Sequence, residues 1–568
     1  MNKRVILILI FILAATLRLY NINWDQGFHL HPDERAIVIF TLPIALPSNL
    51  AEFFHTTSPL NPHFFAYGNF PLYFLKIAGS AAGTLNPYFS GYNGINILGR
   101  FLSVIFELLT IFLLYKLAKK LFTENVALLS SFFYAVSVLA VQSAHFYIVD
   151  IPLTFFIIAL LYVLIAFYEK PDFKKGVLIG IIFGLSLATK TSASVLLLSI
   201  GASLTIDFIL IFLKSPHRPH VWLPHLPRTV KNLILYTLAI IPSTIITFII
   251  FEPYALIDKQ NFIRQTFEQY QMTHNAFVFP YTLQYVGKTP FIYEVKNIFF
   301  WGQGPILSIL SLAGAFYFTY IALKKEKKQK WAQEAIIAIF FWVYFFVVGK
   351  FAIGFMRYLL PVYPLLCLFA GLLSYKIINA LIKFKLNRNI IFYLLFTILF
   401  LIWPLSFLKI YSLPNTRVLA SNWINNNIPY GANIAIEHWD DSLPLFGQEK
   451  YHILTLELYN PDTPVKWQRI NQQLSQADYI IIASNRLYVP LQKLTDCQKL
   501  PQFYCYKQTA NYYKKLFSGE LGFQKVAEFS VYPTIPILNI PINDQSADES
   551  FTVYDHPKIM IFKKNFMR

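Results

Sequence analysis

The sequence predicts a polytopic α-helical membrane protein with a soluble α/β domain at its C-terminal end. Of its 568 residues, 56% are hydrophobic and 14% are charged, whereas an ordinary soluble domain has roughly 25% charged residues. Many apolar runs approach or exceed the roughly 18 residues that cross a bilayer core as a helix. Basic loops alternate with these runs, as is typical of a chain that crosses a membrane repeatedly.

The positive charge of the chain is explained by this arrangement. The formal net charge is +18, a value that would also suit a nucleic-acid-binding protein. Here lysine and arginine concentrate in short loops between apolar runs, as in "YKLAKKLF" and "KKEKKQK". Because the cytoplasmic loops of membrane proteins are enriched in these residues, we expect no nucleic-acid partner.

Eleven segments are expected to span the plasma membrane, with the N-terminus inside and the C-terminus outside the cytoplasm. The first is expected to be a retained anchor, because no small-residue cleavage site follows it. Every second loop is basic and therefore cytoplasmic, including loops 214–231 and 324–330. The predicted spans cover residues 5–20, 98–115, 126–143, 151–168, 176–190, 192–213, 232–251, 303–323, 332–349, 358–375 and 389–411.

Two long loops are expected on the extracytoplasmic side. The first covers residues 21–97 and contains "FPLYFLKIAGSAAG", which is apolar but short and is interrupted by Lys76. A helix lying in the membrane interface suits this stretch better than a span. The second loop covers residues 252–302. Residues 1–411 are therefore interpreted as one membrane domain.

The composition changes near residue 412. Apolar runs shrink to strand length at 432–437, 477–484 and 558–562, and they alternate with helical stretches such as "PVKWQRINQQLSQ". This alternation predicts a soluble α/β domain over residues 412–568, outside the membrane. Cys497 and Cys505 lie in it and can pair in an oxidising compartment. A buried thiol at Cys505, between tyrosines, is the alternative.

Ionisable residues occur beside several predicted spans. The stretch "GFHLHPDERAIV" after the first span contains Asp33 and Glu34. Asp150 lies in the turn between spans three and four, Lys190 in the turn between spans five and six, and Arg357 at the outer end of span ten. In the predicted topology all of them lie at the same membrane face. Charges at this depth are expensive and are usually kept for function.

Each of these residues also has a purely structural interpretation. Pro-Asp-Glu is a common helix start, and Asp150 could cap the fourth span. Lys190 and Arg357 could extend along the apolar surface to bring their charges to the interface. The residues alone leave these alternatives open.

A divalent cation is a further alternative for the first outer loop. His29, His31 and Asp33 alternate in the sequence, and alternate residues of an extended strand share a face. These three side chains could then converge on a metal ion. Three candidate ligands in a loop are weak evidence for a metal, so no cofactor is assigned.

The order of these motifs resembles that of the GT-C glycosyltransferases, specifically the protein O-mannosyltransferase and aminoarabinose-transferase type. The resemblance rests on the "DE" pair, the aspartate of the second outer loop, "ATK" before span six and "RYLLPVYP" at span ten. It also includes "FEPYAL" and "YVGKTPFIYEVKNIFFWGQGP", and so covers about residues 1–410. No single motif is specific. The C-terminal "FTVYDHPKIMIFKK" resembles the tail of such relatives but indicates no substrate.

The resemblance implies an inverting, mannosyltransferase-like transfer of a sugar from a polyprenyl-phosphate-linked donor to an acceptor protein, lipid or glycan. By this carry-over Asp33 is the general base, with its pKa raised by desolvation, and Glu34 orients it. Asp150 would hold the acceptor or the sugar, and Lys190 and Arg357 would bind the donor phosphate. The family pattern requires no cofactor, although the histidines of "HLHPDE" depart from it.

A transporter or lipid flippase is the rival interpretation, since such proteins also use charges within the membrane. Transporters place coupling residues near the bilayer midplane, often within inverted repeats. Here the charges gather at one face, no repeat is visible, and a soluble outer domain follows. A non-catalytic scaffold for cell-wall assembly is a third interpretation, which the sequence does not exclude.

Overall fold

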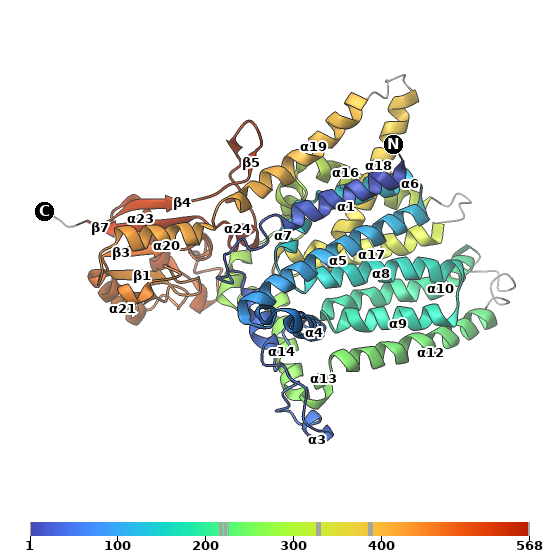
Figure 1. Cartoon of the computed structure of the whole chain (residues 1–568), viewed down its shortest axis with the longest axis horizontal. Coiled ribbons are helices and arrows are strands. Elements are labelled where there is room, and N and C mark those ends of the chain that lie inside the picture. The colour runs from blue at the N-terminus through green and yellow to red at the C-terminus, as the bar shows by residue number, and fades with distance from the viewer. Residues whose placement is uncertain are drawn as a thin grey trace.

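The computed structural model describes residues 2–214, 226–324, 331–383 and 390–565, together with His220 and Pro224. Figure 1 shows a bundle of long helices with a smaller, sheet-containing part at one end. The predicted cytoplasmic loop 324–330 lies outside the described residues except for Lys324, and loop 214–231 is described only in part. The sidedness of these loops therefore stays a prediction.

The predicted spans are helical, and the third is divided between two helices. The helices of the bundle are α1 (Lys3–Leu19), α5 (Tyr92–Leu121), α6 (Glu124–Ala135), α7 (Val138–Ala144), α8 (Asp150–Glu169), α9 (Phe173–Leu187), α10 (Leu196–Lys214), α12 (Leu226–Phe251), α16 (Pro305–Leu323), α17 (Trp331–Gly349), α18 (Tyr363–Lys383) and α19 (Ile390–Leu408).

Length and composition identify fewer spans than predicted. Among the described residues, seven helices are long and apolar enough to cross a membrane, or eight if α6 and α7, which are bent by 57° at their junction, form one span. Helices α1 and α9 have 17 and 15 residues, fewer than the roughly 18 that cross a bilayer core. The predicted total of eleven spans stays a prediction.

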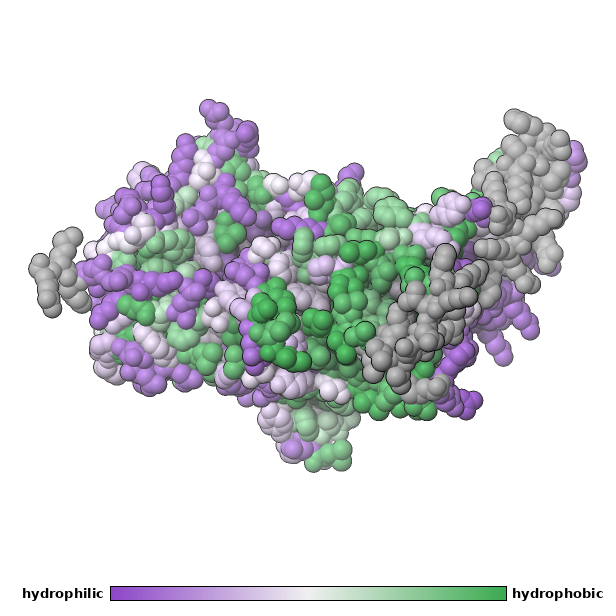
Figure 2. All heavy atoms as spheres, turned by 90° about the horizontal axis from the view of Figure 1, so that it is seen from above, coloured by the Kyte–Doolittle hydropathy of each residue, from purple (hydrophilic) through white to green (hydrophobic). Residues whose placement is uncertain are grey.

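The surface of the bundle is that of a multi-pass membrane protein. In Figure 2 hydrophobic residues dominate the helical part of the visible face, whereas hydrophilic residues cover much of the sheet-containing part. Only 17% of the most apolar stretch of α12 is buried inside the protein. A helix that is apolar on its exposed face needs lipid around it, because water would penalise that surface.

Short helices occupy the two long loops. The first loop holds α2 (Pro32–Thr41), α3 (Leu50–Phe53) and α4 (Phe70–Leu85), and the second holds α13 (Tyr254–Ile257), α14 (Lys259–His274) and α15 (Ile292–Asn297). Helix α4 covers the stretch for which we predicted a helix in the membrane interface. Its depth in a membrane stays a prediction.

The C-terminal part is an α/β domain, as predicted. Its five-stranded sheet has the order β2-β1-β3-β7-β4. Strand β1 runs parallel to β2 and β3, and β7 runs antiparallel to β3 and β4. The elements are α20 (Thr416–Asn427), β1 (Asn433–Glu437), β2 (His452–Leu456), α21 (Pro464–Gln476), β3 (Tyr479–Ile482), α22 (Tyr488–Leu491), α23 (Lys507–Ser518), β4 (Phe523–Phe529), β5 (Thr534–Ile535), β6 (Ile540–Pro541), α24 (Glu549–Thr552) and β7 (Ile559–Lys564).

The sheet is buried on both faces, which explains its continuous apolar strands. Along β7, Ile559 and Ile561 belong to one apolar cluster, whereas Met560 and Phe562 belong to another. Successive side chains of a strand point to opposite faces, so the two clusters cover the two faces of the sheet. Cys497 and Cys505 form a disulfide with a Cα–Cα distance of 5.2 Å, which confirms that prediction.

A buried histidine links the end of the domain to the bundle. His556 faces Asp544 through Nε2 at 2.7 Å and Asp555 through Nδ1 at 2.5 Å. Asp555 also accepts hydrogen bonds from Tyr411 and Gln142 at 2.8 and 3.0 Å. Burial lowers the pKa of His556, but the two carboxylates outweigh burial and raise the pKa to about 10. The imidazole is therefore a cation that holds two acids together.

This arrangement predicts a pH-dependent stability. Because the folded-state pKa of His556 lies above the unfolded value of 6.5, its stabilising contribution is complete below pH 6.5 and is lost as the pH rises toward about 10. Thermal unfolding between these values should show a falling midpoint. His556→Gln should be less stable below pH 6.5, and its difference from wild type should shrink with rising pH. A difference that stays constant would contradict the assignment.

Candidate functional site

Asp33 lies in the first turn of α2. Pro32 is the first residue of the helix, and the side chain of the N-cap residue His31 accepts a hydrogen bond from the Glu34 N–H at 3.4 Å. The predicted helix start is therefore confirmed. Carboxylates in the first turn are favoured by the positive end of the helix dipole, so the position itself stabilises an ionised Asp33.

Arg357 lies between two carboxylates. It belongs to the 3₁₀ segment η6 (Met356–Val362), which precedes α18. Its Nη2 is 2.7 Å from the Asp33 carboxylate, and its Nε is 3.8 Å from Asp150. Asp150 is the first residue of α8, so the guanidinium joins two helices that begin at the same end of the bundle.

Lys190 completes this cluster. Its ammonium is 2.7 Å from the second oxygen of Asp150 and 4.1 Å from the ring centre of Tyr358. The cluster thus consists of Asp33, Arg357, Asp150 and Lys190, in which negative and positive side chains alternate. Their side chains are between 2% and 19% exposed. Four segments that are far apart in the sequence bring together four of the residues singled out by sequence reasoning.

The pKa of Asp33 differs from our expectation. Burial alone raises it, but the adjacent Arg357, together with His31, a hydrogen bond from Tyr67 and Lys190, lowers the pKa below its ordinary value. We expected desolvation to prevail, and that was wrong because a guanidinium at contact distance favours the charged form more strongly. Asp33 is therefore ionised at neutral pH but is a weak base while Arg357 is bound to it.

Glu34 does not orient Asp33. Arg100 of α5 donates to both of its oxygens at 2.9 and 2.7 Å, and the backbone N–H of Tyr147 donates at 2.9 Å. Arg100 also binds Asp25 at 2.6 Å. Consecutive helical residues point about 100° apart, so Glu34 faces α5 when Asp33 faces Arg357. This corrects the predicted role, because Glu34 belongs to a fully buried ionic group.

The correction has a direct test. Glu34→Ala leaves the buried Arg100 with Asp25 as its only carboxylate partner, and breaking a buried pair typically costs about 3–5 kcal/mol. We expect a clearly lower unfolding temperature of the detergent-solubilised protein. Glu34→Gln, which still accepts one hydrogen bond, should fall between Ala and wild type. Wild-type stability in both variants would argue against a structural role.

The two histidines do not converge with Asp33. His29 has a φ of +52°, so the chain is not extended at His29 as the metal hypothesis required. Its Nε2 lies 2.9 Å from the Asn93 amide oxygen, and its ring stacks on Tyr92. His31 uses its Nδ1 to cap the helix. The pKa of its imidazole is lowered to about 3, mainly by burial. No three His, Cys, Asp or Glu residues are grouped to hold a metal within the described part of the chain.

Asp33 and Arg357 face a cavity of about 490 Å³ between the bundle and the C-terminal domain. Tyr67 and Tyr358 line it on the side of the bundle. Asp150 and Lys190 are not among its lining residues and lie behind Arg357. The opposite wall comes from the C-terminal domain and consists of Arg417, Trp439, Asp440, Asp441, Arg486, Glu549 and Tyr554.

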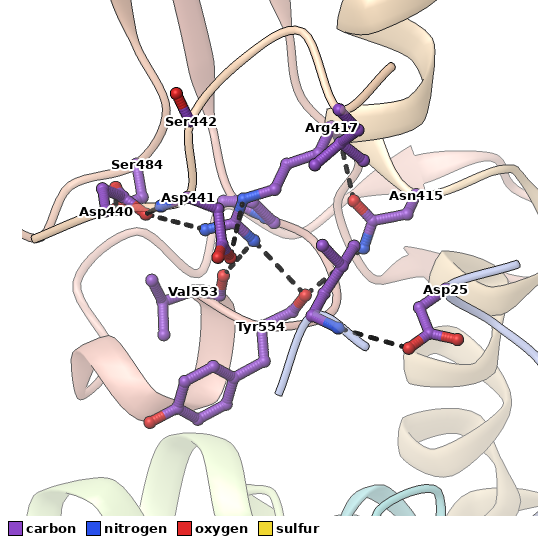
Figure 3. A network of polar contacts seen from close by, with 12 residues as sticks. Asp25, Asn415, Arg417, Asp440, Asp441, Ser442, Ser484, Val553 and Tyr554 are labelled. Carbon is purple, nitrogen blue, oxygen red and sulfur yellow. Dashed lines mark hydrogen bonds and ion pairs between the residues drawn. The ribbon is translucent and has the colours of Figure 1, made fainter. Parts of the chain in front are cut away.

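Sequence reasoning missed this second wall. Figure 3 shows part of it, where the buried Arg417 lies 3.0 Å from Asp440, 3.6 Å from Asp441 and 2.6 Å from the carbonyl oxygen of Val553. Asp441 also binds Arg35 of α2 at 3.1 Å, across the cavity. One signal was present, since both acids follow the parallel strand β1, and the carboxyl ends of parallel strands are common ligand sites.

Comparison with known proteins supports this architecture. Residues 96–241 match the family model described as dolichyl-phosphate-mannose-protein mannosyltransferase. The oligosaccharyltransferase of Archaeoglobus fulgidus in its apo form superposes with a TM-score of 0.50 at 13% identity, over 86% of this chain and 71% of that chain. The chain has the GT-C glycosyltransferase fold.

A further solved structure also matches this chain. ArnT of Cupriavidus metallidurans, solved with undecaprenyl phosphate, matches with a TM-score of 0.42 at 13% identity, over 86% of this chain and 94% of that chain. No curated protein matches the sequence. The family match extends from α5 into α12 and so includes Asp150 and Lys190, but it includes neither Asp33 nor Arg357.

Proposed function

We propose that this GT-C chain is a glycosyltransferase that moves a sugar from a polyprenyl-phosphate-linked donor to an acceptor outside the cytoplasm. The observation that carries the proposal is the contact between Asp33 and Arg357 on the wall of the cavity. A carboxylate that could accept a proton thus lies beside a guanidinium that could bind an anion. The match of residues 96–241 to a mannosyltransferase family model supports the same class.

Arg357 is the donor's phosphate partner in this proposal. Its Nη1 is buried and forms no hydrogen bond with any residue that the structure describes, so the protein leaves part of the hydrogen-bonding capacity of the guanidinium unused. A guanidinium can bind a phosphate through two parallel hydrogen bonds. Negative charge builds on the phosphate as the sugar bond breaks, and a fixed cation there stabilises the transition state. Lys190, which lies behind Arg357 as seen from the cavity, adds further positive charge.

Asp33 is the general base. In the structure Arg357 holds its carboxylate, but a bound phosphate would compete for the same guanidinium. As that contact weakens, the pKa of Asp33 rises and the carboxylate becomes a better proton acceptor. The base is thus weak in the site without donor and stronger once the donor is bound, which couples proton transfer to the presence of substrate.

The reaction is a single displacement. The acceptor hydroxyl gives its proton to Asp33, its oxygen bonds to the anomeric carbon, and the bond from that carbon to the phosphate oxygen breaks. Polyprenyl phosphate leaves with the electron pair, and the anomeric configuration inverts. One base suffices, and no carboxylate nucleophile is needed. The donor itself carries the leaving group, so the reaction requires no cofactor.

Asp150 takes a different role from the one inferred from sequence. Its two oxygens face Lys190 and Arg357, and it does not line the cavity. We therefore assign it to positioning the two cations rather than to holding the acceptor or the sugar. A carboxylate between two cations also lowers their mutual repulsion and keeps both near the place of the phosphate.

The function can be tested in cells with and without the gene. Mass spectrometry of the lipid fraction should show that a polyprenyl-phosphate-linked sugar accumulates when the gene is absent. One class of glycosylated protein, lipid or glycan should be lost at the same time, which would identify the acceptor. Unchanged lipid-linked sugars together with unchanged glycoconjugates would argue against a glycosyltransferase.

A further inference from the structure

The hairpin between β5 and β6 carries an exposed apolar tip. Ile537 is 96% exposed, Leu538 is 66% exposed and Ile540 is 50% exposed. The segment from Phe529 to Asn543 contains no charged residue. Single exposed apolar residues are common on proteins, but several together at the end of an uncharged projection indicate a surface that contacts something apolar.

The conformation of the tip is unfavourable for an isolated hairpin in water. Ile537 has a φ of +69° and Asn539 a φ of +53°, and positive φ is rare for a β-branched residue. The sheet has only two strands of two residues each, and two-stranded hairpins are marginally stable at best in water. Strain of this kind persists where surrounding contacts hold it, yet the protein leaves Ile537 almost fully exposed.

The base of the hairpin is attached to the end of a membrane helix. Val531 and Ile542, on either side of the hairpin, pack in the same apolar cluster as Phe407 and Leu408 of α19. Figure 1 shows β5 beside α19, with the hairpin extending away from the bundle. The hairpin therefore leaves the protein where a membrane helix meets the C-terminal domain.

Helix α19 faces lipid along this edge. Its exposed apolar residues recur at helical spacing and form one stripe along the helix. They are Leu395, Ile398, Leu399, Ile402 and Leu405, each between 38% and 62% exposed. The exposed apolar tip belongs to a hairpin that contacts this same helix.

We propose that the hairpin tip, Ile537–Leu538, inserts into the lipid surface of the membrane leaflet that adjoins the C-terminal domain. Lipid covers the apolar side chains, and the free energy gained by burying them offsets the strain of the turn. Because the segment from Phe529 to Asn543 contains no charge, it can enter the lipid without desolvating an ion. The tip is a further attachment for a domain that supplies one wall of the cavity, in addition to the contact of Asp441 with Arg35 of α2. Its partner is a phospholipid bilayer, not another protein.

A fluorescent label at the tip tests this proposal directly. Cys497 and Cys505 are paired, Cys367 is buried, and the sequence has three cysteines, so Leu538→Cys provides the only accessible thiol. The full-length protein would carry an environment-sensitive dye at this position in nanodiscs of phosphatidylethanolamine and phosphatidylglycerol. Tyr430→Cys, at a position 83% exposed in the turn between α20 and β1, is the matched control.

The dye at position 538 should emit at shorter wavelength than the dye at position 430. A nitroxide attached near the top of the lipid acyl chains should quench it, and should leave the dye at 430 bright. Two results would overturn the proposal. Equal emission at both positions would place the tip in water, and a short-wavelength emission without quenching would place it against protein.

Discussion

Asp33→Asn should reduce turnover by about 10²–10⁴-fold, the usual contribution of a general base, without reducing the amount of folded protein. Asparagine has nearly the same shape but cannot take the acceptor's proton. The substitution also frees Arg357 from its carboxylate at 2.7 Å. Binding of polyprenyl phosphate to the variant should therefore be as tight as to wild type or tighter. Turnover should thus fall while binding does not weaken.

The matched control for this variant is Asp441→Asn. Asp441 lines the same cavity but pairs with Arg35 and Arg417 rather than with Arg357. Its loss should change turnover far less than the loss of Asp33. Wild-type turnover by Asp33→Asn, measured with the same donor, would remove Asp33 from the mechanism.

Arg357→Ala should weaken both donor binding and the rate, in contrast to Asp33→Asn. The phosphate loses its charge partner before and during bond breaking, and removal of one such preorganised donor typically costs about 10²–10³-fold in rate. Arg357→Lys should recover part of the loss, because lysine restores the charge but not the two parallel hydrogen bonds. Titration with polyprenyl phosphate and initial rates at saturating donor separate the two effects.

Arg35→Gln provides the comparison for charge alone. Arg35 also lines the cavity, but it binds Asp441 of the C-terminal domain. If any cation in the cavity were sufficient for the phosphate, Arg35→Gln would weaken donor binding as much as Arg357→Ala does. We expect donor binding close to wild type. Equal losses in the two variants would mean that the phosphate is not held at Arg357.

Much of the candidate site could be predicted from local sequence. Asp33, Asp150, Lys190 and Arg357 each follow or precede an apolar segment, and counting segments places them at one face. The structure brings all four into contact. Such a prediction succeeds because a membrane helix has only two ends, so the parity of the segments decides which residues can meet.

Other features depend on packing that no local pattern reports. Glu34 is adjacent to Asp33 in sequence, but the rotation of a helix sends it to Arg100. The pKa of Asp33 follows from one guanidinium placed by a segment more than 300 residues away along the chain. The second wall of the cavity required the docking of an entire domain on the bundle, where Asp441 contacts Arg35 of α2, more than 400 residues away along the chain.

The measurement that tests the account most directly uses lipids extracted from cells that lack the gene. If the proposal is right, these lipids contain the accumulated donor. Purified protein and an envelope extract of the same cells would be added, and mass spectrometry would follow the lipid. The account predicts that wild-type protein converts a polyprenyl-phosphate-linked sugar to free polyprenyl phosphate, while Asp33→Asn binds the lipid but leaves the sugar attached. Conversion at the same rate by both proteins, or by neither, would contradict it.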